Sequence, residues 1–418
     1  MSQHALHSAG AKAWRSLPCL RSELRLDLTL GCGQTFRWRE TGKDHWTGVM
    51  GGRVWTLTQT EDTLWYHVYS RLGNPGLVNG QKRKAGGEPR GSAKKSKGMT
   101  NVKEEQDELD HDDVSSEQEE KEEMLLRDYF QLDVKLVDLY KEWSHADQHF
   151  SQTAHIFTGV RMLRQDPVEC LFSFICSSNN HISRIQGMVE RLCNTLGTPL
   201  CKLDEAHYHD FPSLQALADS KVEACLRDLG FGYRARFLQQ SAHLIMTSHG
   251  PDWLYKLRST PYLQARDALR TLPGVGLKVA DCVCLMSLDK SEAVPVDTHV
   301  WQIAKRDYSC AAGHGQKTLT DKVYNEIGDF FRKLWGCYAG WAHSVSKIRF
   351  FVFSLLLLLY HTHSLSLSQV LFCADLKKFQ NLKEDALKEE KNEKKMLKNK
   401  KTSRNKRETV KMEEEGGQ

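Results

Sequence analysis

A long charged run divides the chain into two parts whose apolar residues repeat with different periods. Residues 82–103 hold eight Lys or Arg against one Glu, and residues 104–123 hold twelve acidic residues against one Lys. Runs of like charge with almost no aromatic residues cannot bury enough apolar surface to offset the loss of chain entropy. We therefore expect 80–124 to be a disordered linker, with folded structure on either side of it.

The two flanking parts differ in pattern. Residues 20–70 alternate between apolar and polar residues, and Gly-containing turns separate the alternating segments, which predicts an antiparallel sheet. Beyond the linker, apolar residues recur at three- and four-residue steps. Helices are expected over 124–143, 167–192, 211–229, 233–248 and 262–271. The sequence predicts an α+β fold, with an N-terminal β-rich domain over 1–79 and a mainly helical domain over 125–344.

Composition excludes several classes of protein. The 418 residues carry a net charge of +5, with 27% charged and 40% hydrophobic residues, which is unlike a collagen, a coiled coil or a multi-span membrane protein. Twelve cysteines are scattered without a C-x-x-C pair, so we expect a reducing compartment. The N-terminus has no apolar signal-peptide core. The basic tail 381–418, expected to be disordered, favours a nuclear address and leaves a mitochondrial fraction open.

The segment 345–369 fits neither pattern. Residues 350–360 are strongly apolar, but a membrane span needs about 20 such residues, so a membrane-anchored form is only a minor alternative. The segment is rich in Phe, Leu, Ser and Tyr, whose codons are largely pyrimidine-rich, and it ends in Ser-Gln, as a translated splice-acceptor tract would. We interpret it as a retained intron or exon-edge error that interrupts the helical domain, which would resume at 370–380. A dominant transcript containing all 25 codons would contradict this hypothesis.

The sharpest local motif is Leu272-Pro-Gly-Val-Gly-Leu-Lys278, which lies between two helical stretches. Gly274 and Gly276 allow a sharp turn with positive φ, and the next helix begins at once with its N–H groups pointing outward. Such a helix start can bind a phosphate oxygen. The motif is typical of a helix-hairpin-helix that holds the DNA backbone without reading sequence. A purely structural helix turn is the alternative.

A second motif, Val294-Pro-Val-Asp297, places a carboxylate nineteen residues after Lys278. Because a Pro stops one helix and the Asp precedes another, Asp297 is predicted to be an N-cap. Together the two residues indicate an amine that attacks a sugar C1′ to give a Schiff base, and a carboxylate that stabilises the developing positive charge. The Schiff base would permit strand cleavage by β-elimination. Only an unprotonated amine is nucleophilic, so we expect Lys278 to be desolvated or flanked by positive dipoles.

These motifs resemble the helix-hairpin-helix, Gly-Pro-Asp superfamily of DNA glycosylases, and the wider chain resembles the eukaryotic 8-oxoguanine DNA glycosylases. The supporting segments are Gly33-Gln-Thr-Phe-Arg-Trp38, 164–180, 211–217, 232–236, 302–308 and Gly340-Trp-Ala342. The resemblance implies a base-excision repair enzyme, acting as a monomer, that removes 8-oxoguanine opposite cytosine from duplex DNA and has an associated lyase activity. It implies no metal or other cofactor and no membrane partner. The four-cysteine cluster of iron–sulfur relatives does not follow Asp297.

The resemblance also implies residue roles, carried over by motif match. Lys278 resembles the Schiff-base nucleophile and Asp297 its carboxylate partner. The implied base pocket is made of Gly33, Cys282, Pro295, His343 and Phe372. The implied DNA contacts are Asn179, Arg184, Tyr233, Arg234, Gly274, Gly276 and His299.

Several of these roles are specific. The carbonyl of Gly33 would accept the N7–H that 8-oxoguanine has and guanine lacks. Cys282 and Phe372 would pack on opposite faces of the flipped base. Asn179 would fill the vacated space and Tyr233 would wedge the duplex. Two arginines, Arg184 and Arg234, would read the orphan cytosine, and His299 would contact a phosphate.

Two departures from the family pattern affect the expected activity. The family has Gln where this chain has His343, so reading of the Watson–Crick edge differs there. The insertion also separates His343 from Phe372 by 28 residues, where the family has three. We therefore predict that the full chain folds the hairpin but is weakened or inactive on 8-oxoguanine, unlike a chain lacking 345–369. The alternatives are a non-enzymatic helix-hairpin-helix DNA-binding protein and an inactive splice variant.

Overall fold

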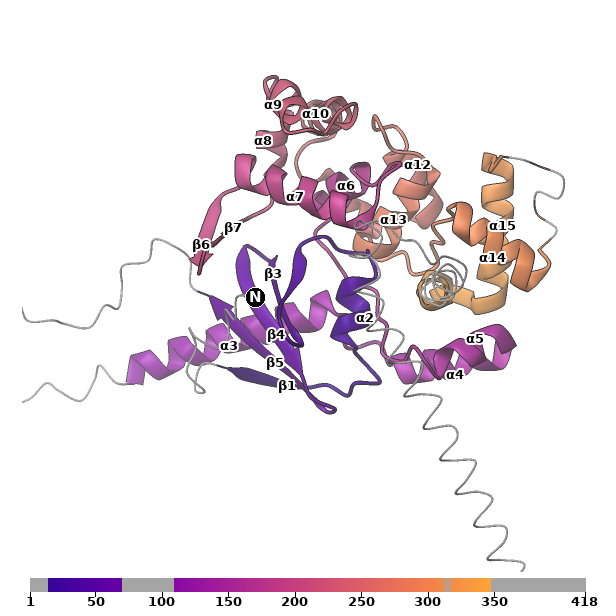
Figure 1. The fold of residues 1–418 in the computed structure, drawn as a ribbon, viewed down its shortest axis with the longest axis horizontal. Helices are drawn as coiled ribbons and strands as arrows, with labels where there is room; N and C mark the ends of the chain where they lie inside the picture. Colours follow the sequence, from indigo (N-terminus) through magenta and orange to yellow (C-terminus); the bar gives the residue numbers. More distant parts are fainter. Residues whose placement is uncertain (1–13, 70–108, 311, 313–315, 317, 347–418) are drawn as a thin grey trace, which may run out of the picture. The chain divides into compact units, whose positions relative to one another are not determined.

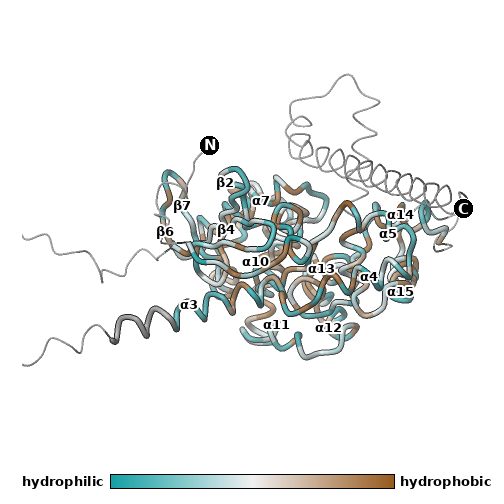
Figure 2. The backbone as a smooth tube through the Cα atoms, turned by 90° about the horizontal axis from the view of Figure 1, so that it is seen from below, coloured by the Kyte–Doolittle hydropathy of each residue, from teal (hydrophilic) through white to brown (hydrophobic). Residues whose placement is uncertain are grey.

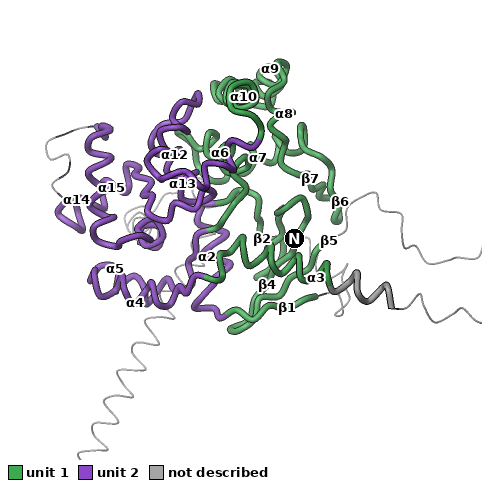
Figure 3. The backbone as a smooth tube through the Cα atoms, turned by 180° about the vertical axis from the view of Figure 1, so that it is seen from behind, with its two compact units in different colours: residues 1–19, 35–133, 163–251 green, residues 20–34, 134–162, 252–418 purple. Residues whose placement is uncertain are grey.

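The computed structural model describes residues 14–69, 109–310, 312, 316 and 318–346 (Figure 1). The chain forms two compact units (Figure 3). Unit 1 comprises 1–19, 35–133 and 163–251, and unit 2 comprises 20–34, 134–162 and 252–418. Each unit therefore draws on chain segments that are distant in sequence.

Unit 1 contains the five-stranded antiparallel sheet that the alternating pattern predicts. Its strands are β1 (Arg15–Pro18), β2 (Trp38–Gly42), β3 (His45–Met50), β4 (Arg53–Gln59) and β5 (Thr63–Tyr69), in the spatial order β1-β5-β4-β3-β2. The central strand β4 buries Val54, Trp55 and Leu57 completely. The α+β prediction, with a sheet followed by helices, is confirmed.

Helix α3 (Leu109–Tyr129) begins inside the acidic run, so the predicted disorder of 80–124 is wrong from residue 109 onward. Two residues of the helix are buried, Leu126 completely and Glu122 to 2% exposure. The Glu122 carboxylate accepts a hydrogen bond from Arg53 Nη1 at 2.6 Å and pairs with Arg15. One face of an acidic segment is thus neutralised by arginines of the sheet, an interaction that local composition does not reveal.

A short helix lies inside the range 20–70, for which the alternating pattern predicts strands. This helix, α2 (Leu26–Gly31), belongs to unit 2, and its leucines and Thr29 are buried. The Thr29 hydroxyl donates to the Gly159 carbonyl at 3.3 Å, and the Arg25 N–H donates to the same carbonyl at 2.7 Å. A short apolar run has no decisive period of its own, so these tertiary contacts determine its conformation.

The rest of unit 1 is mostly helical. Its helices are α6 (Pro167–Ile175), α7 (Ile182–Leu196), α8 (Leu214–Ala218), α9 (Val222–Asp228), α10 (Arg234–Leu244) and a π-helical turn, η2 (Ile245–His249). The single helix predicted over 167–192 is broken between α6 and α7, where Asn179 has a φ of +48°. A hairpin of β6 (Pro199–Leu203) and β7 (Ala206–His209), not predicted, packs its Leu200 and Cys201 against the sheet.

Unit 2 holds the remaining helices. They are α4 (Leu136–Ala146), α5 (Gln148–Ala154), α11 (Trp253–Lys256), α12 (Tyr262–Leu269), α13 (Leu277–Ser287), α14 (Thr298–Tyr308), α15 (Asp321–Trp335), two 3-10 turns, η3 (Leu257–Ser259) and η4 (Gly336–Tyr338), and the helical residues 339–346. Ten of the eleven residues of α13 are buried, and the exception is Lys278. Figure 2 colours the chain by hydropathy, and α13 belongs to the buried core of unit 2.

The two compact units differ from the predicted domains, since 20–34 groups with helical segments and 163–251 groups with the sheet. The predicted domain boundaries stay a prediction. Residues 347–369 of the insertion, 370–380, the tail 381–418 and Phe372 lie outside the described residues. In the described part of the chain, no helix has the length and apolar character needed to cross a membrane.

Candidate active site

The predicted helix-hairpin-helix is present in unit 2, between α12 and α13. Leu272 and Val275 anchor the turn because both are buried, and the Val275 N–H donates to the Leu272 carbonyl at 3.2 Å. Gly274 has a φ of +79°, which a residue with a side chain adopts only at a cost. Gly276 has a φ of −93° and a ψ of −176°, so the expectation of positive φ at both glycines is wrong for this residue.

Gly276 serves instead as an N-cap without a side chain. An added Cβ there would meet no atom within 4 Å, so the space in front of the helix is open. Because glycine has no side chain, the cap residue makes no side-chain hydrogen bond to the first N–H groups of α13. Outward-pointing N–H groups and the positive end of the helix dipole then face that space, which suits an oxyanion such as a phosphate.

Lys278 lies in the first turn of α13 and is half-buried. It is the single member of that helix that is not enclosed by the core. Cys282, one turn later, is 3% exposed. The side chain of Lys278 thus leaves the core at the N-terminal, positive end of α13.

Asp297 is the N-cap of α14, as predicted. Its Oδ1 accepts hydrogen bonds from the N–H groups of His299 at 3.1 Å and Val300 at 3.0 Å. The preceding residues, including Pro295, are buried, whereas Asp297 is half-buried and His299 is exposed. The carboxylate is thus fixed at the point where a buried segment reaches the surface of unit 2.

His343 lies in the helical residues 339–346 and is 4% exposed, with its ring centroid 6.3 Å from that of Phe331. Gly340 holds this helix close to the segment that precedes Asp297. Its N–H donates to the Ser291 carbonyl at 2.9 Å, and a Cβ at 340 would lie 2.2 Å from the Ala293 carbonyl oxygen. The Gly of the Gly-Trp-Ala motif is therefore required for close packing, a role that the sequence interpretation did not assign.

Gly33 lies in the turn after α2, with a φ of +83°. The neighbouring Gln34 is 2% exposed, and its Nε2 donates to the carbonyls of Thr29 at 2.9 Å and Arg161 at 2.8 Å. These two bonds hold the turn in one conformation. The sequence places Gln34 in the Gly-Gln-Thr-Phe motif but gives it no such role, because its partner Arg161 is far away in the chain.

Four of the seven predicted DNA contacts lie in unit 1, around the break between α6 and α7, whereas Gly274, Gly276 and His299 belong to unit 2. Asn179 is exposed at the tip of the break, and Tyr233 is 50% exposed. The Tyr233 hydroxyl donates to the Ser178 carbonyl at 3.2 Å, and Arg234 donates to the carbonyls of Ser178 and Asn179. The Arg234 guanidinium also lies 4.5 Å from the Tyr233 ring centroid. Arg234, which is 4% exposed, thus stabilises the loop that presents Asn179.

Arg184 occupies the first turn of α7, directly after this loop, and is exposed. His181 caps the same helix by accepting from the Arg184 N–H at 3.4 Å. The structure therefore brings Asn179, Arg184, Tyr233 and Arg234 into one surface region of unit 1. The residues implied for chemistry and base binding, apart from Phe372, belong to unit 2.

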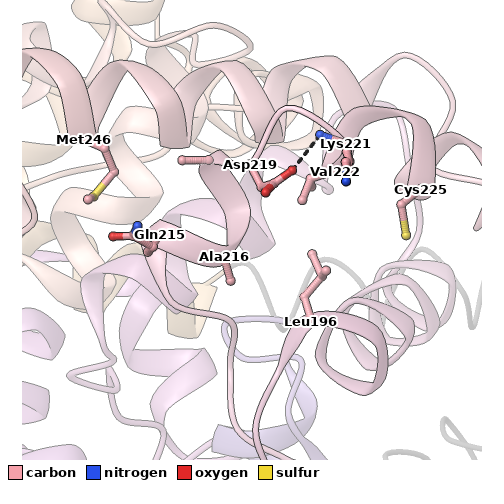
Figure 4. A pocket seen from close by; sticks show the side chains of 9 residues that line it. Leu196, Gln215, Ala216, Asp219, Lys221, Val222, Cys225 and Met246 are labelled. Carbon is pink, nitrogen blue, oxygen red and sulfur yellow. Dashed lines mark hydrogen bonds between the residues drawn. The ribbon is translucent and has the colours of Figure 1, made fainter.

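A cavity of about 680 Å³ in unit 1 is separate from these residues (Figure 4). Its lining is mostly apolar and comes from α7, α8, α9 and η2, and includes Leu196, Ala216, Val222 and Met246. No predicted site residue lines it. Among the residues that the structure describes, no group of three or more His, Cys, Asp or Glu side chains is arranged to hold a metal ion.

Comparison with known proteins links this geometry to a family. The model of the 8-oxoguanine DNA glycosylase N-terminal domain matches residues 16–171, and that of the HhH-GPD superfamily base excision DNA repair proteins matches 172–327. The N-glycosylase/DNA lyase OGG1 of Arabidopsis thaliana is 35% identical over 344 residues, 81% of each chain. The N-glycosylase/DNA lyase of Saccharomyces cerevisiae is 40% identical over 243 residues, 53% of this chain and 64% of the other.

A solved structure is also similar. The structure of MBOgg1 with a low-affinity DNA ligand superposes with a TM-score of 0.61 and 25% identity, over 83% of this chain and 98% of the other. Sequence and fold therefore agree over both the sheet and the helical region.

Proposed function

Because the chain belongs to the 8-oxoguanine DNA glycosylase family of base-excision repair N-glycosylase/DNA lyases, we propose that it excises 8-oxoguanine paired with cytosine from duplex DNA. We further propose that it acts as a monomer in the nucleus, directed there by its basic tail. The observation that carries the proposal is the half-buried Lys278 in the first turn of α13, whose other ten residues are all buried.

The proposed reaction begins with attack of the Lys278 Nζ lone pair on C1′ of the damaged nucleotide. The C1′–N9 bond breaks, and its electron pair leaves with the base, which takes up a proton. The Asp297 carboxylate would stabilise the positive charge that develops on the sugar. Ring opening gives a Schiff base, which permits loss of the 3′ phosphate by β-elimination, so one lysine accounts for both activities.

Selection of the damaged base is assigned to the Gly33 carbonyl. It would accept the N7–H of 8-oxoguanine, whereas guanine would leave this carbonyl facing a lone pair at a cost of about 1–3 kcal/mol. The two hydrogen bonds of Gln34 support this role because they prevent the turn from moving away from the wrong base. Cys282 and Pro295 would line the same pocket, with His343 as a further member.

Access to the base requires that it leave the helical stack. We assign Asn179 to the vacated space, Tyr233 to the wedge, and Arg184 and Arg234 to the orphan cytosine. The hairpin residues Gly274 and Gly276, together with His299, would hold the phosphates. The exposure of Asn179 and Tyr233 in one region of unit 1 supports this assignment.

Borohydride trapping tests the proposal directly. The chain lacking 345–369 should form a covalent adduct with a duplex containing 8-oxoguanine opposite cytosine, the full chain should form the same adduct more weakly, and neither should form one with the undamaged duplex. Lys278→Gln should abolish the adduct but still bind the duplex. Lys256→Gln, which removes an exposed charge from α11, should trap as the wild type does. An undiminished adduct in Lys278→Gln would refute the assignment of the nucleophile.

The same assay decides the question raised by the insertion. Deletion of 345–369 would restore the short spacing between His343 and Phe372, so we expect faster nicking of the damaged duplex than with the full chain. Equal rates would contradict the interpretation of 345–369 as a foreign segment. A protein that binds duplex DNA but never traps in either form would instead be a non-enzymatic DNA-binding module.

A further inference from the structure

A buried hydrogen-bond chain joins the helix of Lys278 to the segment that ends at Asp297. Asp281, on α13, is fully buried. Its Oδ2 accepts from the Tyr324 hydroxyl at 2.7 Å, and the same hydroxyl accepts from the Val296 N–H at 3.2 Å. Val296 directly precedes Asp297 and is 1% exposed. All of these residues belong to unit 2.

The other carboxylate oxygen is also occupied. Asp281 Oδ1 accepts from the Tyr262 hydroxyl of α12 at 2.8 Å. Two arginines lie nearby, since the guanidinium groups of Arg266 and Arg332 are 5.5 Å and 5.6 Å from the Tyr262 ring centroid. Both phenols thus donate to one carboxylate, but only the Tyr324 hydroxyl also receives the backbone N–H of the segment before Asp297.

We propose that Tyr324, held by Asp281, is a positioning residue that sets the segment 294–297, and with it the Asp297 carboxylate, relative to the helix of Lys278. This inference rests on the proposed function. Burial of a donor without its acceptor is costly, so the Val296 N–H strongly favours the conformation that reaches Tyr324. Small displacements of reacting groups lower rates steeply, by about a hundredfold for 1 Å, so this bond controls chemistry at a distance.

The chain offers a matched control for this role. Tyr324→Phe removes the hydroxyl that links Asp281 to Val296, whereas Tyr262→Phe removes an equivalent donor to the same carboxylate without touching the segment. Both substitutions keep the ring, so core packing is preserved. Each removes one donor to Asp281, but only Tyr324→Phe also leaves the buried Val296 N–H without its acceptor, so only that substitution should disturb Asp297.

Two measurements test the proposal on the full chain. The first is amide hydrogen exchange of 293–297, which does not depend on activity. Tyr324→Phe should speed exchange of the Val296 amide at least about tenfold more than Tyr262→Phe does. The second is the single-turnover rate of borohydride-trapped adduct formation at saturating protein, on duplexes holding 8-oxoguanine or an abasic site. Tyr324→Phe should lower the rate on 8-oxoguanine about ten- to hundredfold with duplex affinity within twofold of wild type, and Tyr262→Phe should not.

Equal effects of the two substitutions, in exchange or in rate, would overturn the positioning role. A chain lacking 345–369 that neither excises 8-oxoguanine nor traps on the abasic site would refute the proposed function instead. In that case the exchange measurement still decides whether Tyr324 holds the segment.

Discussion

At the scale of single residues, the Asp297 carboxylate has two separable tasks. Its Oδ1 caps α14 through the N–H groups of His299 and Val300, and its charge is proposed to act on the sugar. Capping needs only a hydrogen-bond acceptor, which Asn supplies as well as Asp does. Stabilising a developing positive charge needs the anion.

We therefore predict that Asp297→Asn keeps the free energy of unfolding close to that of wild type but loses most of the excision rate. Asp297→Ala should lose the same activity and about 1 kcal/mol of stability in addition, because the cap is also gone. Urea unfolding and single-turnover excision measure the two effects separately. An excision rate of Asp297→Asn equal to that of wild type would show that the negative charge is not needed.

The sequence names the candidate site residues because each stands in a short contiguous motif, and their roles stay predictions. The supports of those residues could not. Gln34 reaches the Arg161 carbonyl across more than a hundred residues of chain, and Gly340 packs on the Ala293 carbonyl. Such contacts depend on the tertiary arrangement, to which local spacing gives no access.

At the scale of secondary-structure elements, the hairpin assigns different tasks to its two glycines. Gly274 is needed for backbone conformation, because its φ is +79°. Gly276 has an extended conformation that any residue adopts, and open space faces its Cα. Gly276 is therefore needed so that a phosphate can approach the start of α13, and not for the turn itself.

This difference predicts opposite outcomes for the same substitution. Gly274→Ser should cost about 1–2 kcal/mol of stability, the penalty for a side chain in the left-handed region. Gly276→Ser should leave stability unchanged or raise it by a few tenths of a kcal/mol, since Ser is a good N-cap. The new side chain would occupy the phosphate space, so affinity for an undamaged duplex should fall several-fold. Fluorescence anisotropy at fixed salt measures the affinity for the duplex, and thermal unfolding measures the stability. An affinity of Gly276→Ser equal to that of wild type would contradict the proposed phosphate site.

Helices and strands could be predicted where apolar residues repeat regularly, as in the sheet and in α12. They were not where a few tertiary contacts outweigh local pattern. The leucines of α2 alternate like a strand, yet hydrogen bonds to Gly159 hold a helix, and the acidic start of α3 continues into a face paired with Arg15 and Arg53. The break that exposes Asn179 also lies within an apolar run that reads as one helix.

At the scale of the whole molecule, the buried Asp281 makes global stability depend on pH. Burial raises the pKa of its carboxyl to about 6, against hydrogen bonds from Tyr324 and Tyr262 and the positive charges of Arg266 and Arg332, which lower it. The folded protein therefore binds this proton more tightly than the unfolded chain, whose carboxyl has a pKa near 4. The stabilisation of the folded state by this bound proton is fully present below about pH 4 and is lost as the pH rises through 6.

We predict that Asp281→Asn removes this dependence. Between pH 5 and pH 7.5, the free energy of unfolding of wild type should fall by about 1 kcal/mol relative to that of the variant, because the buried carboxylate becomes charged only in wild type. Urea unfolding of both proteins at the two pH values gives the difference. A parallel pH dependence would show that Asp281 titrates alike in the folded and unfolded states.

The burial of α13 also affects how long the proposed nucleophile, Lys278, keeps its position. Segments with few buried contacts open locally at little cost, whereas a helix surrounded by the core opens only with global unfolding. With ten of its eleven residues buried, α13 belongs to the second class. The amine of Lys278 is therefore carried by a segment whose lifetime is that of the fold itself, and fraying of termini or loops leaves this proposed nucleophile in register with the core.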